Sequence, residues 1–322
     1  MDEEKNTAMI PQDRQAFITS ARAELESRSV SQAELARQID MSGSVVSSFF
    51  TGRYKGDHDE VARKIKAVMA GWKAGDRLNA GLDRVRDFVE TPTSARIEKT
   101  LQFAKTRSVI VVIGGGSGIG KSKTLKEYAA RNPAVWYCEF SRDTKSEHDI
   151  LVEIGKAVGL VNMPGHSASL RRTIVERVKR TRGLLICDEA QHLRGEGAFD
   201  EVRTIYDRSE NGSPPIGIAL AGHLDLFDKI ARYAQVEGRI AAPLRLPNAT
   251  AKDVDALCDY WELDCRRCRA FLRSHAQDRT GLRRIAKAYE LALSYAAADP
   301  EGVVTLDHVR EAWAAFSGST SN

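Results

Sequence analysis

The sequence predicts an α/β protein in which a parallel β-sheet is flanked by helices, with a helical segment before it and another after it. Short apolar runs of strand length alternate with amphipathic helical stretches in the middle of the chain, which is typical of a buried parallel sheet. One such run, Val109–Ile113, leads directly into a glycine-rich turn and a helix. Helical periodicity occupies both flanking regions, so we expect a helical domain at each end.

The length of 322 residues favours two or three domains. We expect a helical DNA-binding domain over residues 1–74, a linker over 75–94, the α/β core over 95–248 and a helical lid over 249–322. The linker is predicted from its mixture of glycines, a proline and charged residues.

Charge and cysteine content narrow the class of protein. The net charge is +4, from 48 basic and 44 acidic residues, which is too small to require a nucleic-acid partner. The five cysteines lack the second pair or the histidines of a zinc site, so we expect them all to be reduced thiols. A signal segment and an apolar run of membrane length are both missing from the sequence. We therefore expect a cytoplasmic protein without a membrane partner.

Two short helices around a tight turn form the centre of the N-terminal domain. Ser31 followed by Glu34 is a capping box that starts the first helix, and Ser44–Phe50 has the apolar spacing of the second. A helix over Gln12–Arg28 precedes them, and another that contains Val61–Trp72 follows. The pattern predicts a helix-turn-helix and resembles the phage-repressor type, whose second helix enters the major groove of DNA.

The outward positions of this second helix are serines, which bond to bases or phosphates without much discrimination. Basic residues follow the helix and would contact the DNA backbone. The basic and acidic residues of the domain are balanced in number, so a small helical bundle that binds proteins is the alternative. The expected DNA contacts are Ser44, Ser47, Ser48, Arg53 and Lys55.

A phosphate-binding loop is predicted where the run Val109–Ile113 ends. Gly115–Ser122 has the P-loop spacing of a glycine, four residues and Gly-Lys-Ser, between a predicted strand and a predicted helix. Glycines let the backbone N–H groups surround a triphosphate, and the helix N-terminus adds positive charge. Lys121 would reach the β- and γ-phosphates of ATP, and the Ser122 hydroxyl would bind Mg²⁺. The expected nucleotide contacts are Gly115, Gly116, Ser117, Gly118, Ile119, Gly120, Lys121, Ser122 and Lys123.

A second apolar run, Leu184–Glu189, ends in two acids, which is the Walker B pattern. Asp188 would lie beside the metal ion, and Glu189 would orient and polarise the attacking water. Strands often end in acids, so the pattern gains its meaning from the P-loop upstream. The acid pair favours hydrolysis over binding alone.

The remaining elements alternate as the fold class requires. A helix is expected over Thr93–Lys105 before the P-loop strand, and four helices follow the last strand. The other expected strands are Val135–Phe140, Pro215–Ala221 and Leu244–Leu246. The other expected helices are Glu147–Val158, Leu170–Val178, Lys252–Trp261, Arg266–His275, Gly281–Ala297 and Thr305–Phe316.

Walker A, Walker B, a polar strand tip and a helical lid with G-x-x-R together resemble the AAA+ ATPases. That resemblance implies a first sensor at the tip of the strand, for which His223 is the candidate, with a histidine that bonds a loop carbonyl as the alternative. It implies a finger that acts across a subunit interface, for which Arg239 is the candidate, with a solvated arginine as the alternative. It also implies that Arg284, three residues after Gly281, reaches back to the nucleotide.

Three stretches resemble the family of the phage Mu transposition protein B: Val46–Asp57, Arg86–Thr93 and D-E-A-Q-H-L at Asp188–Leu193. The resemblance implies an ATP-dependent, non-specific DNA-binding protein that forms helical filaments on double-stranded target DNA. It implies delivery of that DNA to a cognate transposase, which stimulates ATP hydrolysis, in the host cytoplasm if the protein is phage-encoded. The family often has asparagine at the first-sensor position, where this chain has Gly222 followed by His223.

Basic runs in the core and in the predicted lid would contact DNA phosphates without reading sequence. We favour the core over the lid run Arg266–Lys287. For each run the alternatives are a solvated helix face or a contact with the transposase. A helicase loader and a P-loop transcription regulator with a defined operator are the rival functions. The expected contacts in the core are Arg142, Lys145, Arg171, Arg172 and Lys179.

Overall fold

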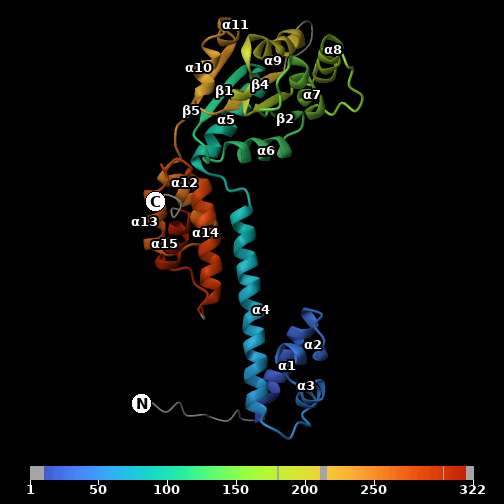
Figure 1. Ribbon diagram of the computed structural model, residues 1–322, viewed down its shortest axis with the longest axis vertical. Helices are drawn as coiled ribbons and strands as arrows, with labels where there is room; N and C mark the ends of the chain where they lie inside the picture. The colour runs from blue at the N-terminus through green and yellow to red at the C-terminus, as the bar shows by residue number, and fades with distance from the viewer. Residues whose placement is uncertain (1–10, 180, 211–215, 300, 317–322) are drawn as a thin grey trace. The chain divides into compact units, whose positions relative to one another are not determined.

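The computed structural model describes residues 11–179, 181–210, 216–299 and 301–316 (Figure 1). The chain divides into two compact units. The first contains residues 1–80 together with 299–302, and the second contains residues 81–298 together with 303–322. Each unit is described by itself below.

The first unit is helical. It contains α1 (Pro11–Ser27), α2 (Gln32–Gln38), α3 (Gly43–Phe50) and the first part of α4 (His58–Arg86). The Ser31 and Ser42 side chains cap α2 and α3, accepting hydrogen bonds from the backbone N–H groups of Glu34 and Val45. These caps fix two short helices on either side of a tight turn, as the sequence predicts. The shared core includes Leu35, Val46, Phe49, Val61 and Ile65.

The predicted linker over residues 75–94 is corrected by α4, which continues as one helix to Arg86. Gly71, Gly75 and Gly81 lie inside this helix. Each costs about 1 kcal/mol relative to alanine, and the packing of the helix offsets that cost. Val85 in its last turn is buried in the core of the second unit. The irregular segment is therefore only residues 87–91, which end at α5 (Pro92–Arg107).

The second unit is built on a five-stranded parallel sheet with the order β2-β3-β4-β1-β5. This confirms the predicted α/β class with a parallel sheet flanked by helices. The strand predicted from Pro215 begins at Gly217, and residue 215 lies outside the described residues. The strands are β1 (Ile110–Gly115), β2 (Val135–Glu139), β3 (Leu184–Asp188), β4 (Gly217–Gly222) and β5 (Ile240–Leu246).

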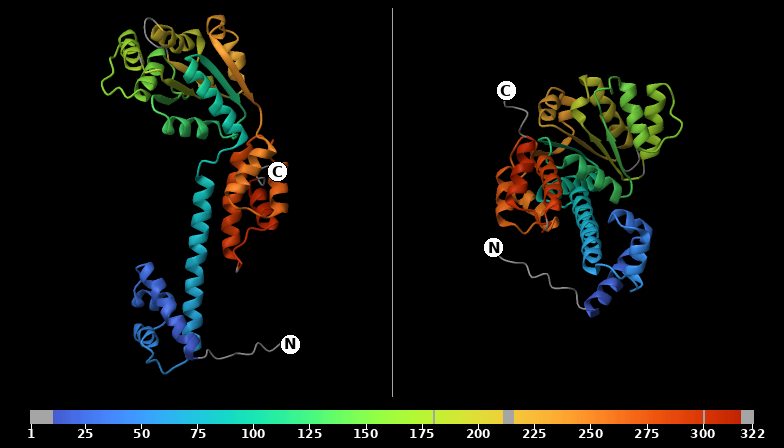
Figure 2. Two further views of the ribbon diagram at one scale, coloured as in Figure 1. Left: turned by 180° about the vertical axis from the view of Figure 1, so that it is seen from behind. Right: turned by 60° about the horizontal axis from the view of Figure 1, so that its bottom comes forward.

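Alternate strand residues face opposite sides of the sheet, so the second unit has two hydrophobic layers. Val111, Ile113 and Ile186 pack with α5 and α6 (Lys121–Arg131) on one side. Ile110 and Val112 pack on the other side with residues of four helices. These helices are α7 (Glu147–Ala157), α8 (Ser167–Val178), α9 (Gly195–Glu210) and α10 (Asp225–Ile230). Figures 1 and 2 show the backbone of the sheet and its helices.

A helical lid follows the sheet, as predicted, and shares the hydrophobic layer of α5 and α6. The lid consists of α12 (Ala251–Tyr260), α13 (Arg266–Ser274), α14 (Gly281–Ala298) and α15 (Leu306–Ala315). Two short elements, the 3₁₀ turn η1 (Ala190–His192) and α11 (Ala234–Glu237), complete the second unit. No helix in the described ranges is both long enough and apolar enough to span a membrane.

One expectation about the cysteines is wrong. Cys265 and Cys268 form a disulfide at the start of α13, because the three-residue spacing at a helix N-terminus brings their Cα atoms within 5.2 Å. Cys138, Cys187 and Cys258 are free and buried, as expected for core thiols.

Candidate functional site

The predicted P-loop connects β1 to α6. Gly118 and Gly120 adopt left-handed backbone conformations, with φ of 76° and 94°. Only glycine adopts these angles at little cost. A Cβ atom at Gly118 would also lie 2.1 Å from the carbonyl oxygen of Thr280 in the lid. The loop therefore needs its glycines both for its curvature and for the approach of the lid.

The N-terminus of α6 is open to an anion. Its N-cap is Gly120, which offers no side chain to bind the N–H groups of the first turn, whereas α5, α7 and α12 each begin with a capping box. Lys121 Nζ donates to the carbonyl oxygens of Gly115, at 2.8 Å, and Gly116, at 2.7 Å. Burial lowers the pKa of Lys121. A phosphate group would satisfy both the helix N-terminus and this half-buried ammonium.

Asp188 lies at the end of β3 with no exposed surface. Its carboxylate accepts hydrogen bonds from Tyr137 Oη, at 2.9 Å, and from the backbone N–H of Glu189, at 2.9 Å. Burial raises the pKa of Asp188, and a hydrogen bond with Ser122 acts in the opposite direction. A cation would stabilise the ionised form of this buried carboxylate.

The hydroxyl of Ser122 and the carboxylate of Asp188 are oxygen ligands of the kind that Mg²⁺ prefers. Within the described ranges, no group of three or more His, Cys, Asp and Glu side chains is placed to hold a metal ion. The residues therefore fit an ion that takes its other ligands from phosphate and water, as Mg²⁺ does at nucleotide sites.

Glu189 follows Asp188 in a left-handed conformation, with φ of 54°. It lines a cavity of about 280 Å³ whose other walls come from the P-loop, η1 and the tip of β4. His223 lies at that tip, where its Nδ1 is 3.3 Å from Asp225 Oδ1. The cavity is lined by Ser117, Lys121, Glu189, Gln191, His223 and Asp225. The structure thus brings together the predicted lysine, carboxylate and strand-tip histidine.

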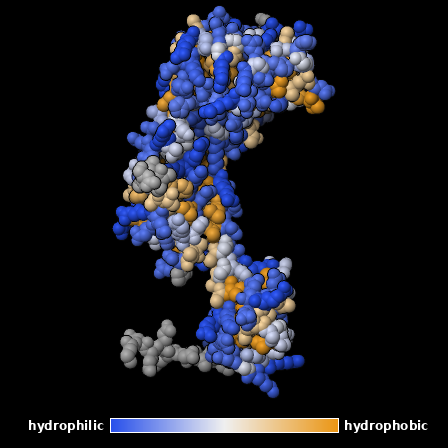
Figure 3. Space-filling view, viewed as in Figure 1, coloured by the Kyte–Doolittle hydropathy of each residue, from blue (hydrophilic) through white to orange (hydrophobic). Residues whose placement is uncertain are grey.

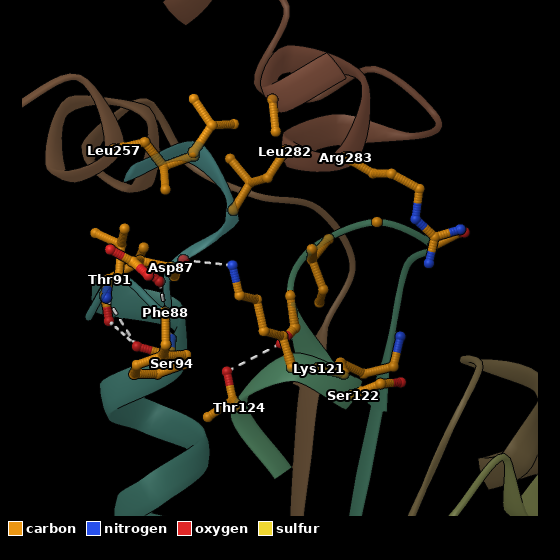
Figure 4. Close-up of a pocket in the computed structure, with 18 of the residues that line it drawn as sticks. Asp87, Phe88, Thr91, Ser94, Lys121, Ser122, Thr124, Leu257, Leu282 and Arg283 are labelled. Carbon is orange, nitrogen blue, oxygen red and sulfur yellow. Dashed lines mark hydrogen bonds between the residues drawn. The ribbon is translucent and has the colours of Figure 1, made fainter. Parts of the chain in front are cut away.

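A second cavity of about 270 Å³ lies on the lid side of the P-loop. Figure 4 shows Lys121, Ser122 and Thr124 from the P-loop and α6, with Leu257, Leu282 and Arg283 of the lid opposite. This apolar end suits a nucleotide base, and the prediction of the site did not include it. The sequence pointed to this cavity only through the stretch Arg86–Thr93, which was noted because it resembles the family. Its apolar lining includes Val85, Phe88, Val89, Leu257, Trp261, Leu282 and Ala286.

Two predicted nucleotide contacts have other partners. Lys123 lines the second cavity, but its Nζ donates to the backbone carbonyls of Arg86, at 2.7 Å, and Asp87, so it fastens the irregular segment to α6. Arg284 stacks on the ring of Trp313, with Cζ 4.2 Å from the ring centroid.

Arg283, the residue before the predicted Arg284, is the lid arginine that lies at the second cavity. Arg283 lines the cavity, and its backbone N–H donates to Gly118 O at 3.1 Å. Successive helix residues differ by about 100° in direction, and the two arginines accordingly point to different surroundings. Arg283 lines the cavity, whereas Arg284 packs on Trp313.

Arg239 lies before β5 and is half exposed. Its Nε donates to Asp207 Oδ1 at 3.1 Å. It is not among the residues that line either cavity.

The predicted DNA contacts differ in their availability. Ser44, Ser47, Arg53 and Lys55 of the first unit are exposed, and Ser48 is half buried. In the core, Arg142, Lys145 and Arg172 are exposed. Lys145 lines a polar cavity of about 490 Å³ with His148 and Arg194, two further basic residues that the prediction did not include. The face of the second unit seen in Figure 3 is mostly hydrophilic.

Arg171 is a correction to the predicted set. Its guanidinium binds both carboxylate oxygens of Glu201 on α9, whose side chain is only 5% exposed. Glu201 is 30 residues from Arg171 in the sequence, so the sequence around Arg171 did not indicate this partner. Lys179 pairs with Glu176 one turn earlier, and Arg180 of the same run lies outside the described residues.

Comparisons with known proteins match the two parts of the second unit separately. Residues 104–230 match the family described as AAA domain, and residues 238–316 match the family described as Mu B transposition protein, C terminal. The chain is 29% identical over 257 residues to the Mu-like prophage FluMu DNA transposition protein B of Haemophilus influenzae, covering 77% of this chain and 86% of the relative. It is 27% identical to the ATP-dependent target DNA activator B of Escherichia phage Mu, covering 90% and 91%.

Solved structures with the same fold belong to AAA+ proteins. The ORC2 protein of Aeropyrum pernix, in its ADPNP–ADP complexes, superposes with a TM-score of 0.57 at 18% identity and covers 74% of this chain and 72% of that one. CDC6P from Pyrobaculum aerophilum superposes with a TM-score of 0.56 at 14% identity, covering 70% and 68%. At these identities the likeness is one of fold, and it confirms the predicted P-loop core.

Proposed function

We propose, on the premise that this chain is an AAA+ protein of the Mu transposition protein B type, that it is an ATPase which binds target DNA and delivers it to a transposase. The observation that carries the proposal is the coverage of the relatives, because the target DNA activator of phage Mu aligns with 90% of this chain. The site supports it, because a phosphate loop, a buried carboxylate and an apolar cavity for a base lie together.

ATP hydrolysis is the chemical step of this proposal. Lys121 and the N–H groups of the P-loop would hold the phosphates, and Ser122 and Asp188 would hold Mg²⁺, which would neutralise developing charge on the phosphates. Glu189 orients a water in the cavity that also contains His223, which is proposed to sense the γ-phosphate. The Glu189 carboxylate accepts a proton from that water as the water oxygen bonds to the γ-phosphorus and the bond to the bridging oxygen of the leaving ADP breaks.

DNA binding is proposed to be independent of sequence. The helix-turn-helix presents Ser44 and Ser47, which lack the paired donors and acceptors of bidentate base readout. Arg142, Lys145 and Arg172 would contact phosphates. Arg171 is omitted from this set because Glu201 holds it.

Self-assembly is proposed to couple the two activities. Arg239 lines neither nucleotide cavity of its own chain, so a role at the phosphates requires a neighbouring copy. We propose that copies assemble into an ATP-dependent helical filament on double-stranded DNA, and that contact with the transposase then stimulates hydrolysis.

A salt titration of DNA binding tests this function. The full chain is titrated against several unrelated duplexes, with ATP, with a non-hydrolysable analogue and without nucleotide, and electron microscopy examines the same samples. We expect ATP-dependent binding that weakens steeply with salt and differs little between duplexes, together with filaments. Tight binding to a single duplex without ATP would instead identify a transcription regulator.

A further inference from the structure

We infer that Gln191 is a positioning residue that aims the Glu189 carboxylate at the attacking water. The inference rests on the proposed ATPase function and extends it to a residue outside the Walker motifs. Gln191 lies on η1, two residues after Glu189, and lines the same cavity of about 280 Å³.

The side chain of Gln191 joins two parts of the site. Its Nε2 donates to Glu189 Oε2, and its Oε1 accepts a hydrogen bond from the backbone N–H of His223 at 3.1 Å. One amide therefore links the carboxylate at the end of β3 to the tip of β4.

An amide side chain suits both contacts. A carboxylate needs a donor and a backbone N–H needs an acceptor, and the two ends of a glutamine side chain supply one of each. Glutamate at this position would place a second negative charge against Glu189, and methionine would offer no donor. The chemistry of the two partners thus accounts for the residue type.

The backbone around Gln191 is fixed as well. Lys229 Nζ donates to the carbonyl oxygen of Gln191 at 2.6 Å and ion-pairs with Asp225 Oδ2 at 3.6 Å. Asp225 in turn pairs with the His223 ring. Both polar atoms of the Gln191 side chain are thus hydrogen-bonded, and its backbone carbonyl is bound by Lys229. The Glu189 carboxylate therefore has a narrow range of orientations.

Gly222 keeps the space that this arrangement needs. A Cβ atom at Gly222 would lie 2.2 Å from Gln191 Oε1, closer than non-bonded atoms approach. Gly222→Ala should therefore displace the amide without changing Gln191 itself. This gives the inference a second variant that acts through the same contact.

The experiment compares full-length Gln191→Met, Gln191→Glu and Gly222→Ala with the original protein and with Glu189→Gln. DNA-stimulated kcat and KM are measured, and the Kd of a fluorescent ATP analogue is measured directly. A misplacement of about 1 Å lowers kcat by about 100-fold, so we expect losses of that order with Kd and KM within about twofold. The double variant Glu189→Gln/Gln191→Met should be no slower than Glu189→Gln.

Two control variants remove ordinary effects of substitution. Gln102→Met removes a glutamine whose Oε1 accepts a 2.9 Å hydrogen bond from Tyr128 Oη, away from the cavity. Gly71→Ala adds a Cβ atom where no other atom lies within 4 Å. Both should keep kcat.

The outcomes separate the inference from the function that it rests on. Unchanged kcat in Gln191→Met, beside an inactive Glu189→Gln, overturns the role of Gln191 and leaves the ATPase proposal standing. Loss of nucleotide affinity in step with kcat also overturns it, because a structural defect would explain the result. Unchanged turnover in Glu189→Gln would instead remove the chemical step of the proposed function.

Discussion

The hydroxyl of Tyr137 on β2 donates a 2.9 Å hydrogen bond to Asp188 Oδ2 on β3. Tyr137 pairs in register with Ile186, and Asp188 lies two residues further along β3, opposite Glu139 at the end of β2. Burial and the neighbouring Asp188 raise the pKa of Tyr137, so the phenol remains a donor at neutral pH. It holds one oxygen of the carboxylate that we propose as a Mg²⁺ ligand.

Tyr137→Phe should weaken the response to Mg²⁺. Removing a hydrogen bond to a metal-binding side chain usually lowers metal affinity by about 10- to 100-fold. Nucleotide binding is measured over a Mg²⁺ titration with a fluorescent analogue. Tyr128→Phe, which removes a hydroxyl bonded to Gln102 instead, is the control. Equal Mg²⁺ midpoints for the two variants would rule out the role of Tyr137.

Lys121→Ala and Glu189→Gln should separate binding from hydrolysis. The lysine variant loses a charge-assisted contact with the phosphates, and affinity should fall by about 10- to 100-fold. The glutamine variant keeps the shape of the side chain but loses its basic oxygen, so nucleotide should bind while turnover falls by about 10²- to 10⁴-fold. Calorimetry and a phosphate-release assay measure the two quantities. A Glu189→Gln protein with normal turnover would remove Glu189 from its proposed role.

Arg239→Ala should impair hydrolysis on DNA while a single chain still binds ATP. A mixture of Arg239→Ala with Glu189→Gln should recover some activity, because one type of interface then has both groups. The measurement is DNA-stimulated phosphate release over a range of mixing ratios. Absence of recovery at every ratio would argue against a finger that acts on a neighbouring copy.

Arg142→Ala and Arg171→Ala should have opposite signatures. Arg142 is exposed, so its loss should lower DNA affinity, reduce the salt dependence by about one ion and leave stability unchanged. Arg171→Ala leaves the buried Glu201 without its partner, which typically costs about 3–5 kcal/mol of stability. Thermal unfolding and DNA titration distinguish the two. A stable Arg171→Ala protein with reduced DNA affinity would restore Arg171 to the binding surface.

Arg283→Ala should weaken ATP binding more than Arg284→Ala. A charged donor to phosphate contributes about 1.5–3 kcal/mol, so we expect a roughly 10-fold or larger rise in Kd for the first variant. The second should chiefly lower the melting temperature, because Arg284 packs on Trp313 in the lid. Calorimetry and thermal unfolding compare the two. A larger rise in Kd for Arg284→Ala than for Arg283→Ala would support Arg284 as the nucleotide contact, as the sequence predicts.

The parts of the site that could be predicted are those set by neighbours in the sequence. Val109–Ile113, the glycines and Lys121 form a strand, a turn and a helix start through local preferences alone. The acids at Asp188 and Glu189 could be read in the same way, since they end an apolar run. The order of strands, β2-β3-β4-β1-β5, then places both motifs at the carboxyl ends of the two strands that flank β4.

The parts that could not be predicted depend on contacts between distant segments. Glu201 pairs with Arg171 from another helix. Val85 lies in α4 and lines the second cavity, but the glycines and charged residues of that stretch led to the prediction of a linker. Gln191 reads as one more polar residue until the tip of β4 is known to meet it. The lid motif predicted the helix but not the rotation of the helix about its axis, and that rotation determines whether Arg283 or Arg284 lines the cavity.

The approach of the lid to Gly118 bears on how freely this chain can vary. A Cβ atom at Gly118 would collide with the carbonyl of Thr280, and the carbonyl of Gly118 accepts a hydrogen bond from the backbone N–H of Arg283. Packing against the lid therefore restricts this position, in addition to the proposed phosphate contact. In a saturation library selected only for folding, with no nucleotide or DNA required, Gly118 should already be depleted of substitutions. At Gly120, where no atom lies within 4 Å of a would-be Cβ, a substitution meets backbone strain without a clash, so fewer variants should be lost under that selection. Within the same loop, substitutions at Gly118 would thus be limited by folding, and those at Gly120 chiefly by catalysis.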